Sequence, residues 1–381
     1  MLALALVSGL SVCVSAPCSP LAPAAYDSWS LKVGVAPRPA DATADVSGVS
    51  FGLIGDRTAR MRGLQLGLIY AQTDDELRGV QTAIGVNFAD GTFVGAQVAG
   101  GVNFASVGRG VQLALGLNVA GRMRGAQLAI VNDAEDGRGV QAGLHNTGIR
   151  VAGFRIGLTN RAEEVRGVQV GLVNGTGTIE GVQVAVVNVA RRTRGIQIGV
   201  VNICERDEGE SLAVLNLVKD GVHEVALYAT DTMLSNVALK LGGRHVYTAL
   251  LAAFHPGDAP APGTPQLVRA SRRIGLGLGV GWHQRLQLGR VEALDIEVSG
   301  LGLRAQLDES WRNTPVLWSL RAGIKVRLFE PVALLAGLAA NATVATGGGD
   351  ADVGPGVAEA VIRSGDATTR IYPGAFVGLQ L

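Results

Sequence analysis

The residues of this chain that could carry chemistry include a run of alternating glycines, 274-IGLGLGVG-281. Glycine-rich segments bind phosphate when they form a turn that leads into a helix. Here glycine occupies every second position, which places all the glycines on one face of a strand. No helical pattern follows the run, so we expect no nucleotide site there.

The other candidates are histidines and carboxylates. The five histidines are scattered, without the spacing of metal ligands: His145, His223, His245, His255 and His283. His223 and Glu224 are adjacent, but neighbours on a strand point to opposite faces. Asp231, Asp295 and Glu297 have no identifiable base or nucleophile partner, so we interpret them as solvated or lumen-facing carboxylates. No G-x-S-x-G or Cys–His arrangement occurs, and we predict no enzymatic activity, no cofactor and no metal.

The composition indicates a folded chain and gives no sign of a nucleic-acid partner. The 381 residues include 54 glycines, are 48% hydrophobic and only 17% charged, and carry a formal net charge of +1. The hydrophobic content excludes a disordered chain. The near-zero charge gives no reason to expect a nucleic-acid partner.

An internal repeat sets the positions of many of the glutamines and asparagines. The segment 165-VRGVQVGLVNGTGTIEGVQVAVVNVARRTRGIQIGVVN-202 states one motif three times, G-φ-Q-φ-[G/A]-φ-φ-N, where φ is apolar. The motif recurs every 16 residues at first, then every 15 and then every 14, over residues 62–218. Val168 and Val170 alternate with Gln169, which is the period of a strand. The opening glycine suits a close backbone approach, and the closing asparagine suits a turn.

Two architectures fit one strand per repeat. In a β-solenoid each unit stacks parallel on the last, so that Gln lies on Gln and Asn on Asn in amide ladders. In a porin-like meander the units are antiparallel strands of one large barrel. Connectors of uniform length favour the solenoid. The predicted ladder residues are Gln112, Gln127, Gln141, Gln169, Gln183, Gln197, Asn118, Asn132, Asn146, Asn160, Asn174, Asn188 and Asn202.

Arginines at one repeat position favour the meander instead, because a solenoid would stack like charges. They are Arg62, Arg78, Arg109, Arg124, Arg138, Arg166 and Arg194. Val94, Ala152 and Glu180 interrupt this column, and acidic connectors lie nearby. We therefore keep the solenoid as the leading prediction.

The motif G-V-Q-x-G-L-x-N at 14-residue spacing resembles the short surface-repeat family of Gram-negative bacteria. The resemblance covers residues 62–218, and Arg155 departs from it by replacing the glutamine. It implies an exported, envelope-associated protein, with no enzymatic activity established for the family.

The residue composition changes after Asn216, where aromatic residues become more frequent. Eight segments alternate in polarity: 223–230, 236–243, 245–254, 273–283, 290–307, 316–329, 332–345 and 370–381. Long, glycine-rich strands with aromatics near their ends resemble a small outer-membrane barrel. Arg321, Lys325 and Arg327 point to the lumen if they alternate with Leu320 and Ile324. The segment around Trp29 could pair with the last strand and close the sheet.

The N-terminus has the pattern of a secretory signal. Residues 2–12 are apolar but too short to span a bilayer, and Ala22-Pro23-Ala24 fits a cleavage site. After cleavage near Ala24 only Cys204 would remain, which we expect to be a packed apolar residue.

These observations predict an all-β protein with a repeat β-solenoid followed by an antiparallel β-barrel-like domain. The expected parts are a signal peptide at 1–25, N-terminal strands at 26–61, the repeat array at 62–218 and the C-terminal domain at 219–381. The leading functional hypothesis is a non-enzymatic structural or interaction protein at the outer membrane or cell surface, with the membrane and an unknown envelope or extracellular component as partners. The alternatives are a porin-like channel and a secreted or periplasmic binding scaffold.

Overall fold

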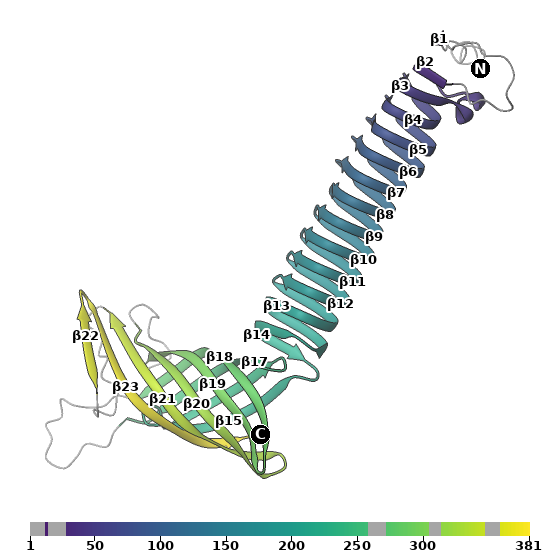
Figure 1. The fold of residues 1–381 in the computed structure, drawn as a ribbon. Coiled ribbons are helices and arrows are strands. Elements are labelled where there is room, and N and C mark those ends of the chain that lie inside the picture. The colour runs from purple at the N-terminus through teal and green to yellow at the C-terminus, as the bar shows by residue number, and fades with distance from the viewer. Residues whose placement is uncertain (1–11, 14–27, 258–271, 305–313, 347–358) are drawn as a thin grey trace, which may run out of the picture. The chain divides into compact units, whose positions relative to one another are not determined.

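The computed structural model describes residues 12–13, 28–257, 272–304, 314–346 and 359–381, and it confirms the all-β class (Figure 1). Nearly all of the expected signal peptide lies outside the described residues. The chain forms two compact units, Met1–Arg191 and Arg192–Leu381. The second unit holds the last coils of the repeat array together with the C-terminal barrel.

The repeats form a parallel β-solenoid, in which each repeat is one coil. Its strands follow chain order in a single sheet of fourteen. They are β1 (Val12–Cys13), β2 (Ser28–Gly34), β3 (Asp45–Gly52), β4 (Gly55–Gly67), β5 (Tyr70–Ala83), β6 (Val86–Ala99), β7 (Val102–Ala114), β8 (Leu117–Leu128), β9 (Val131–Ala142), β10 (His145–Ile156), β11 (Thr159–Val170), β12 (Val173–Val184), β13 (Val187–Asp207) and β14 (Glu210–Val218), with a short 3₁₀ helix η1 (Pro39–Thr43) between β2 and β3.

The register of these strands rules out the single porin-like barrel. From β2 onward every printed pairing in this sheet is parallel, and motif positions face their own copies, as Gly153 of β10 faces Gly139 of β9 and Gly167 of β11. A meander would be antiparallel. The extra residues of the early coils are absorbed as register shifts, for example between Ala89 and Thr92 of β6.

The opening glycine of each motif forms a corner that no other residue fits. Gly139 has φ +126°, and a Cβ added there would lie 2.0 Å from the carbonyl oxygen of Gly125 in the preceding coil. Left-handed backbone and a close approach both require glycine. The predicted role of this glycine is confirmed.

The interior of the solenoid combines amides with small and medium apolar side chains. One inward position holds alanine in most coils, such as Ala120 and Ala134, and another holds a larger residue such as Leu77, Phe93 or Ile179, all buried. The coil is thin, so the remaining interior positions are filled by the glutamine and asparagine of the motif.

The C-terminal sheet is an eight-stranded antiparallel barrel. Its strands are β15 (Val222–Thr230), β16 (Ser235–Gly242), β17 (Val246–His255), β18 (Arg273–Leu288), β19 (Val291–Arg304), β20 (Val316–Phe329), β21 (Val332–Thr346) and β23 (Ala367–Gln380). β15 and β23 pair and close it, with Ala226 opposite Gln380. A short strand, β22 (Ala360–Ser364), extends β23 as a hairpin. All eight predicted segments are barrel strands.

The expected role of the Trp29 segment is wrong. Residues 28–34 form β2, which pairs in parallel with β3 at the start of the solenoid, and the barrel closes without it. The physical reason is that 45-DVSGVSFG-52 is itself a degenerate coil: Gly48 stands opposite Gly63, and Ser50 opposite Gln65. The solenoid therefore begins before residue 62.

Within the second unit the last coil packs on the barrel wall. The Thr248 hydroxyl of β17 donates a hydrogen bond of 2.5 Å to the carbonyl of Ala213 in β14. Glu210 of β14 accepts a bond of 3.0 Å from the backbone N–H of Val246 and lies 2.8 Å from His245 Nδ1. Leu241 and Thr248 are buried there, so β14 covers part of the wall of β16 and β17.

Candidate functional site

The predicted glutamine ladder is present and lies inside the solenoid. Its members in the first unit are fully or almost fully buried. Where two consecutive coils of the first unit both carry the glutamine, the Nε2 of the later one donates to the Oε1 of the earlier one: Gln127 to Gln112 at 2.8 Å, Gln141 to Gln127 at 2.7 Å and Gln183 to Gln169 at 2.8 Å. Gln197 is also buried, and its Oε1 accepts a bond of 3.3 Å from the Ser211 hydroxyl.

The asparagine ladder runs beside the glutamine ladder, and its hydrogen bonds point in the opposite direction along the coils. Each Nδ2 donates to the Oδ1 of the asparagine one coil later, at distances from 2.8 to 3.1 Å. The pairs are Asn118–Asn132, Asn132–Asn146, Asn146–Asn160, Asn160–Asn174, Asn174–Asn188 and, in the second unit, Asn202–Asn216. The same Nδ2 groups also donate to backbone carbonyls, as Asn118 does to Leu128 at 3.0 Å. The ladders satisfy amides that would otherwise be costly to bury.

Arg155 interrupts the glutamine ladder. Its side chain is fully buried, and Nε donates to Gln141 Oε1 at 2.7 Å. A guanidinium cannot accept a hydrogen bond, so the Nε2 of Gln169 in the next coil has no partner among the described residues. Burial lowers the pKa of Arg155 to about 10, and Asp133 offsets part of that shift.

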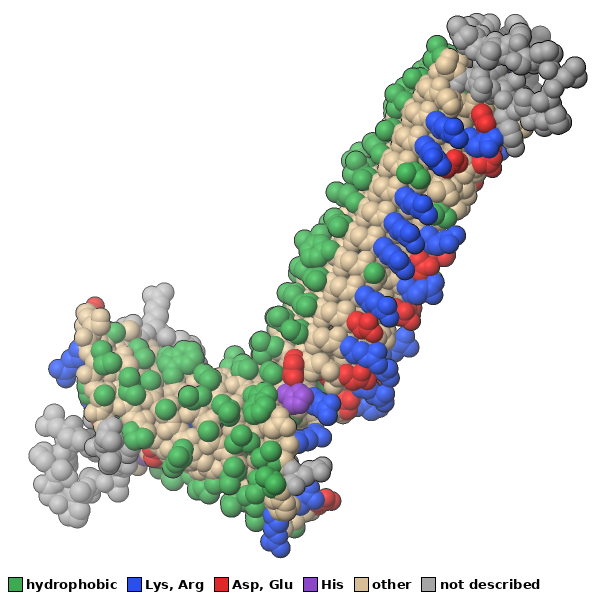
Figure 2. All heavy atoms as spheres, viewed as in Figure 1, with side chains coloured by type: hydrophobic (Ala, Val, Ile, Leu, Met, Phe, Trp, Pro, Cys, Tyr) green, Lys and Arg blue, Asp and Glu red, His purple; other side chains and the backbone are tan. Residues whose placement is uncertain are grey.

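The motif residues that alternate with the glutamine point outward and form an apolar face. We use this name for the three positions that precede the glutamine by one residue and follow it by one and three residues, in the coils from Val49 to Val186. These positions hold Val, Leu, Ile, Ala or Phe in every coil except at Thr82 and Gly100. Leu115 is 74% exposed and Leu144 is 52% exposed. Figure 2 shows these side chains as a continuous hydrophobic row along the first unit.

Charged side chains line a different side of the same coils (Figure 2). Arg109, Arg124 and Arg138 stack in consecutive coils, as the sequence predicted. Within the column, Arg166 lies 3.0 Å from Glu180, which relieves part of the repulsion. At a neighbouring position of the coils, Arg150 lies 2.7 Å from Asp136.

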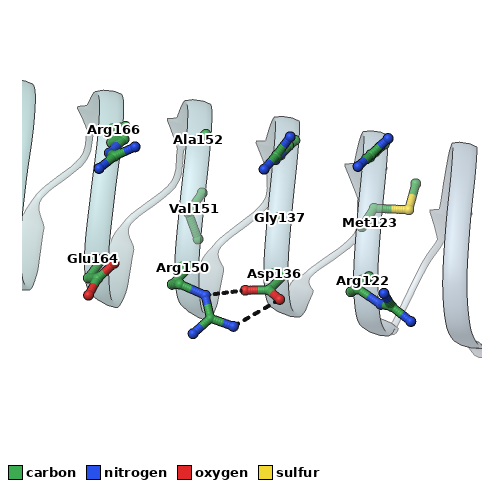
Figure 3. A pocket seen from close by; sticks show the side chains of 11 residues that line it. Arg122, Met123, Asp136, Gly137, Arg150, Val151, Ala152, Glu164 and Arg166 are labelled. Carbon is green, nitrogen blue, oxygen red and sulfur yellow. Dashed lines mark hydrogen bonds and ion pairs between the residues drawn. The ribbon is translucent and has the colours of Figure 1, made fainter.

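A shallow groove of about 410 Å³ runs among these charged side chains (Figure 3). Arg122, Arg150 and Asp136 line it on neighbouring coils. The hydrogen bond from Arg150 lowers the pKa of Asp136, and the same contact raises the pKa of Arg150. The groove is open and its charges largely pair with one another, so it resembles a solvated face more than a binding site.

The barrel interior contains a buried network of ionic groups that the sequence did not reveal. Asp295 lies 2.6 Å from Lys240 Nζ and 2.6 Å from His283 Nδ1. Glu297 accepts a hydrogen bond of 3.1 Å from the Tyr247 hydroxyl and pairs with Arg321. The interpretation of Asp295 and Glu297 as lumen-facing carboxylates is therefore confirmed, but both have partners.

These partners lie on other strands, far apart in sequence, so no local motif could identify them. Asp231 does not join the network and is exposed after the end of β15. Arg321 points to the lumen as predicted, Lys325 is nearly buried and pairs with Glu224 at 2.7 Å, and Arg327 is exposed.

The lumen is filled by these side chains together with apolar ones. Leu251, Leu301 and Leu317 belong to one buried cluster with Tyr372 and Phe376. The cavity beside the ionic network measures only about 20 Å³, enough for about one water molecule. Eight strands enclose just enough space for side chains.

The outer wall of the barrel is apolar. Residues that alternate with the lumen positions are half-exposed or more: Leu227, Leu278, Val298, Trp318, Leu320 and Val377. The barrel thus has charged and polar groups inside together with an apolar cluster, and mainly aliphatic and aromatic groups outside.

Cys204 is buried, and its thiol lies 3.3 Å from the Thr193 hydroxyl. This confirms the prediction of a packed residue, and burial raises the pKa of the thiol. Among the described residues no group of three or more His, Cys, Asp or Glu side chains is placed to hold a metal ion. In the same part of the chain no helix is long and apolar enough to cross a membrane.

Comparison of the chain with models of protein families, with curated proteins and with solved structures gives no match in any of the three. The class is therefore defined by the structure alone: a parallel β-solenoid with buried Asn and Gln ladders, followed by an eight-stranded antiparallel barrel.

Proposed function

We propose that this protein is a non-enzymatic protein of the bacterial outer envelope, in which the barrel is an outer-membrane anchor and the solenoid is a structural or interaction scaffold. The observation that carries the proposal is the inverted polarity of the barrel. Its wall exposes Leu278, Val298 and Trp318, whereas Lys240 and Asp295 are buried in the lumen. Membrane barrels alternate in this sense because their outer residues face lipid.

The strand lengths suit a bilayer. β19 and β20 each contain 14 residues, which corresponds to about 45 Å at roughly 3.3 Å per residue. A strand tilted by about 40° then rises about 35 Å, enough for the hydrocarbon core of about 30 Å.

The scaffold role is supported by the regularity of the solenoid. Its buried polar residues bond to one another and to the backbone, so they stabilise the coil and are not available to a substrate. The resemblance of the repeat to the surface-repeat family of Gram-negative bacteria supports export and a place in the outer membrane or at the cell surface.

The two alternatives fit the structure less well. A porin-like channel needs an open lumen, whereas the network of Lys240, Asp295 and Arg321 fills this one. A secreted or periplasmic scaffold would leave the apolar wall of the barrel in water, where contiguous apolar surface of this extent is rare.

Cell fractionation tests the proposal. We expect the full-length protein in the outer-membrane fraction, resistant to extraction with alkaline carbonate. Recovery of folded protein in the soluble periplasm or the medium would contradict the anchor and favour the secreted scaffold.

A further inference from the structure

The apolar face of the solenoid is as large as the largest apolar patches that monomeric proteins expose. It spans the ten coils from β3 to β12, roughly 45 Å at about 4.8 Å per coil, and its three columns cover a width of about 13 Å. The resulting area of roughly 600 Å² lies at the upper end of what monomeric proteins expose. Its side chains include Ile84, Leu115 and Ile130, each more than half exposed.

The face is also hollowed. A groove of about 820 Å³ runs along it over the coils of β3 to β8. Its floor consists of the glycine or alanine that follows the glutamine by two residues, such as Gly67, Ala83 and Ala99. Larger apolar residues such as Leu113 and Leu115 line the groove as well. The motif thus specifies a groove as well as a strand.

The composition of the face indicates what covers it. Protein interfaces depend on aromatic and arginine anchors and on hydrogen bonds that fix the register. The apolar face contains only two aromatic residues, Phe51 and Phe154, no charged residue, and Thr82 as its only side chain able to form a hydrogen bond. Identical coils could slide along a second copy without a preferred register. A fluid hydrocarbon phase, by contrast, can cover the face without being aligned with individual coils.

The last coils of the solenoid, which belong to the same unit as the barrel, also expose apolar residues at these motif positions. They continue the apolar positions with Ile198, Val200 and Val214, all exposed. The coil of Val214 packs on Thr248 of the barrel. If the barrel is embedded in a membrane, as proposed above, these positions lie at that membrane.

We propose that the apolar face of the solenoid contacts the hydrocarbon of the membrane, with lipid acyl chains filling its groove. The face is longer than the hydrocarbon core is thick, about 45 Å against about 30 Å. It therefore touches lipid along its whole length when the solenoid axis runs at a low angle to the membrane plane. This inference rests on the proposed function, since the barrel supplies the anchor.

Site-directed fluorescence tests it in the full chain. The three native cysteines are replaced by serine, and one cysteine is introduced at a time and labelled with bimane. Leu68→Cys and Leu144→Cys report on the apolar face. Arg62→Cys and Arg138→Cys are matched controls on the charged side of the same two coils. The labelled proteins are reconstituted into phosphatidylethanolamine–phosphatidylglycerol vesicles with and without nitroxide-labelled acyl chains.

We expect the nitroxide lipids to quench the labels at residues 68 and 144 several-fold more than those at 62 and 138. A label at Leu278→Cys on the barrel wall reports insertion separately. Quenching at 278 with none at 68 and 144 would overturn the inference and leave the anchor intact. No quenching at 278 would overturn the anchor and the inference together. Disulfide formation between 144 positions of two copies, without quenching, would assign the face to self-association.

Discussion

At the residue scale, Arg155 is the position in the solenoid core where hydrogen bonding is least complete. Its guanidinium occupies a glutamine position, leaves Gln169 Nε2 without a partner, and has an unbonded Nη2 of its own. A buried charge without a carboxylate partner destabilises a fold even where some of its donors are bonded.

Arg155→Gln should therefore stabilise the protein by about 1–3 kcal/mol, because the new Oε1 can accept from Gln169 and the buried charge is removed. Chemical denaturation of the two proteins measures the difference. A decrease in the free energy of unfolding would show that the bond from Arg155 to the carbonyl of Arg161, 3.1 Å long, outweighs the ladder.

The gain in stability from Arg155→Gln should also depend on pH. Burial lowers the pKa of Arg155 in the folded protein to about 10, well below the pKa of an exposed arginine in the unfolded chain. Below pH 10 both states are protonated, and the folded state bears the full desolvation penalty, on the order of 3 kcal/mol. Above pH 10 the folded state releases its proton first, so wild-type stability rises relative to the variant. We expect the difference in the free energy of unfolding between the two proteins to shrink from pH 8 to pH 11. A constant difference would contradict the lowered pKa.

Asn174 tests the second ladder. Its amide donates to Asn188 Oδ1 at 3.1 Å and accepts from Asn160 at 2.9 Å, in full burial. Asn174→Val should lower the free energy of unfolding by about 2–4 kcal/mol, because two neighbours lose partners in a dry interior. Thr178→Val, at a half-buried position of the same coil, is the control and should change stability by less than about 0.5 kcal/mol. Equal melting temperatures for both variants would refute a structural ladder.

At the element scale, the corner glycine makes the stacked coil possible. In β12 a Cβ on Gly181 would lie 2.0 Å from the Gly167 carbonyl oxygen, at φ +144°. Gly175, in the same coil, has nothing within 4 Å of an added Cβ and no left-handed backbone. The two positions therefore form a matched pair.

Gly181→Ala should destabilise the solenoid by at least about 2 kcal/mol, since it combines backbone strain with a clash between coils. Gly175→Ala should be neutral or stabilising by up to about 1 kcal/mol. Thermal unfolding followed by circular dichroism measures both. Similar melting temperatures for the two variants would mean that the coils can separate enough to admit a side chain at the corner.

The sequence allowed the strands, their parallel order and the ladders to be predicted, because period and connector length are local properties. It did not show which side of the coil is the interior. Alternation places Val168 and Gln169 on opposite faces but does not say which is buried. The structure buries the glutamine because a ladder satisfies its amide, as between Gln183 and Gln169. The ionic pairs of the lumen were not predictable, since Lys240 and Asp295 are 55 residues apart.

At the scale of the whole molecule, solenoid and barrel share one feature: both bury hydrogen-bonded polar groups beside an apolar cluster and expose aliphatic groups on one surface. In the first unit Gln112 is buried while Leu115 is exposed, and in the barrel Glu297 is buried while Val298 is exposed. An exposed aliphatic surface is favourable where the surroundings are apolar, and this is the physical basis of the proposed membrane location.

The filled lumen leads to a prediction for the intact protein. Reconstituted into planar bilayers, it should give no steady ionic conductance, because Tyr247, Arg321 and Phe376 close the space around a cavity of about 20 Å³. Reproducible single-channel steps from properly inserted protein would favour the porin-like alternative.

The most direct test of the membrane anchor is the electrophoretic mobility of the folded full-length chain, purified in mild detergent and run in SDS with and without boiling. A closed membrane barrel resists SDS until it is heated, so the account predicts two distinct mobilities and a shift to the unfolded position on boiling. A single mobility, from protein that also stays folded and soluble without detergent, would contradict the membrane barrel and leave the solenoid as a soluble scaffold.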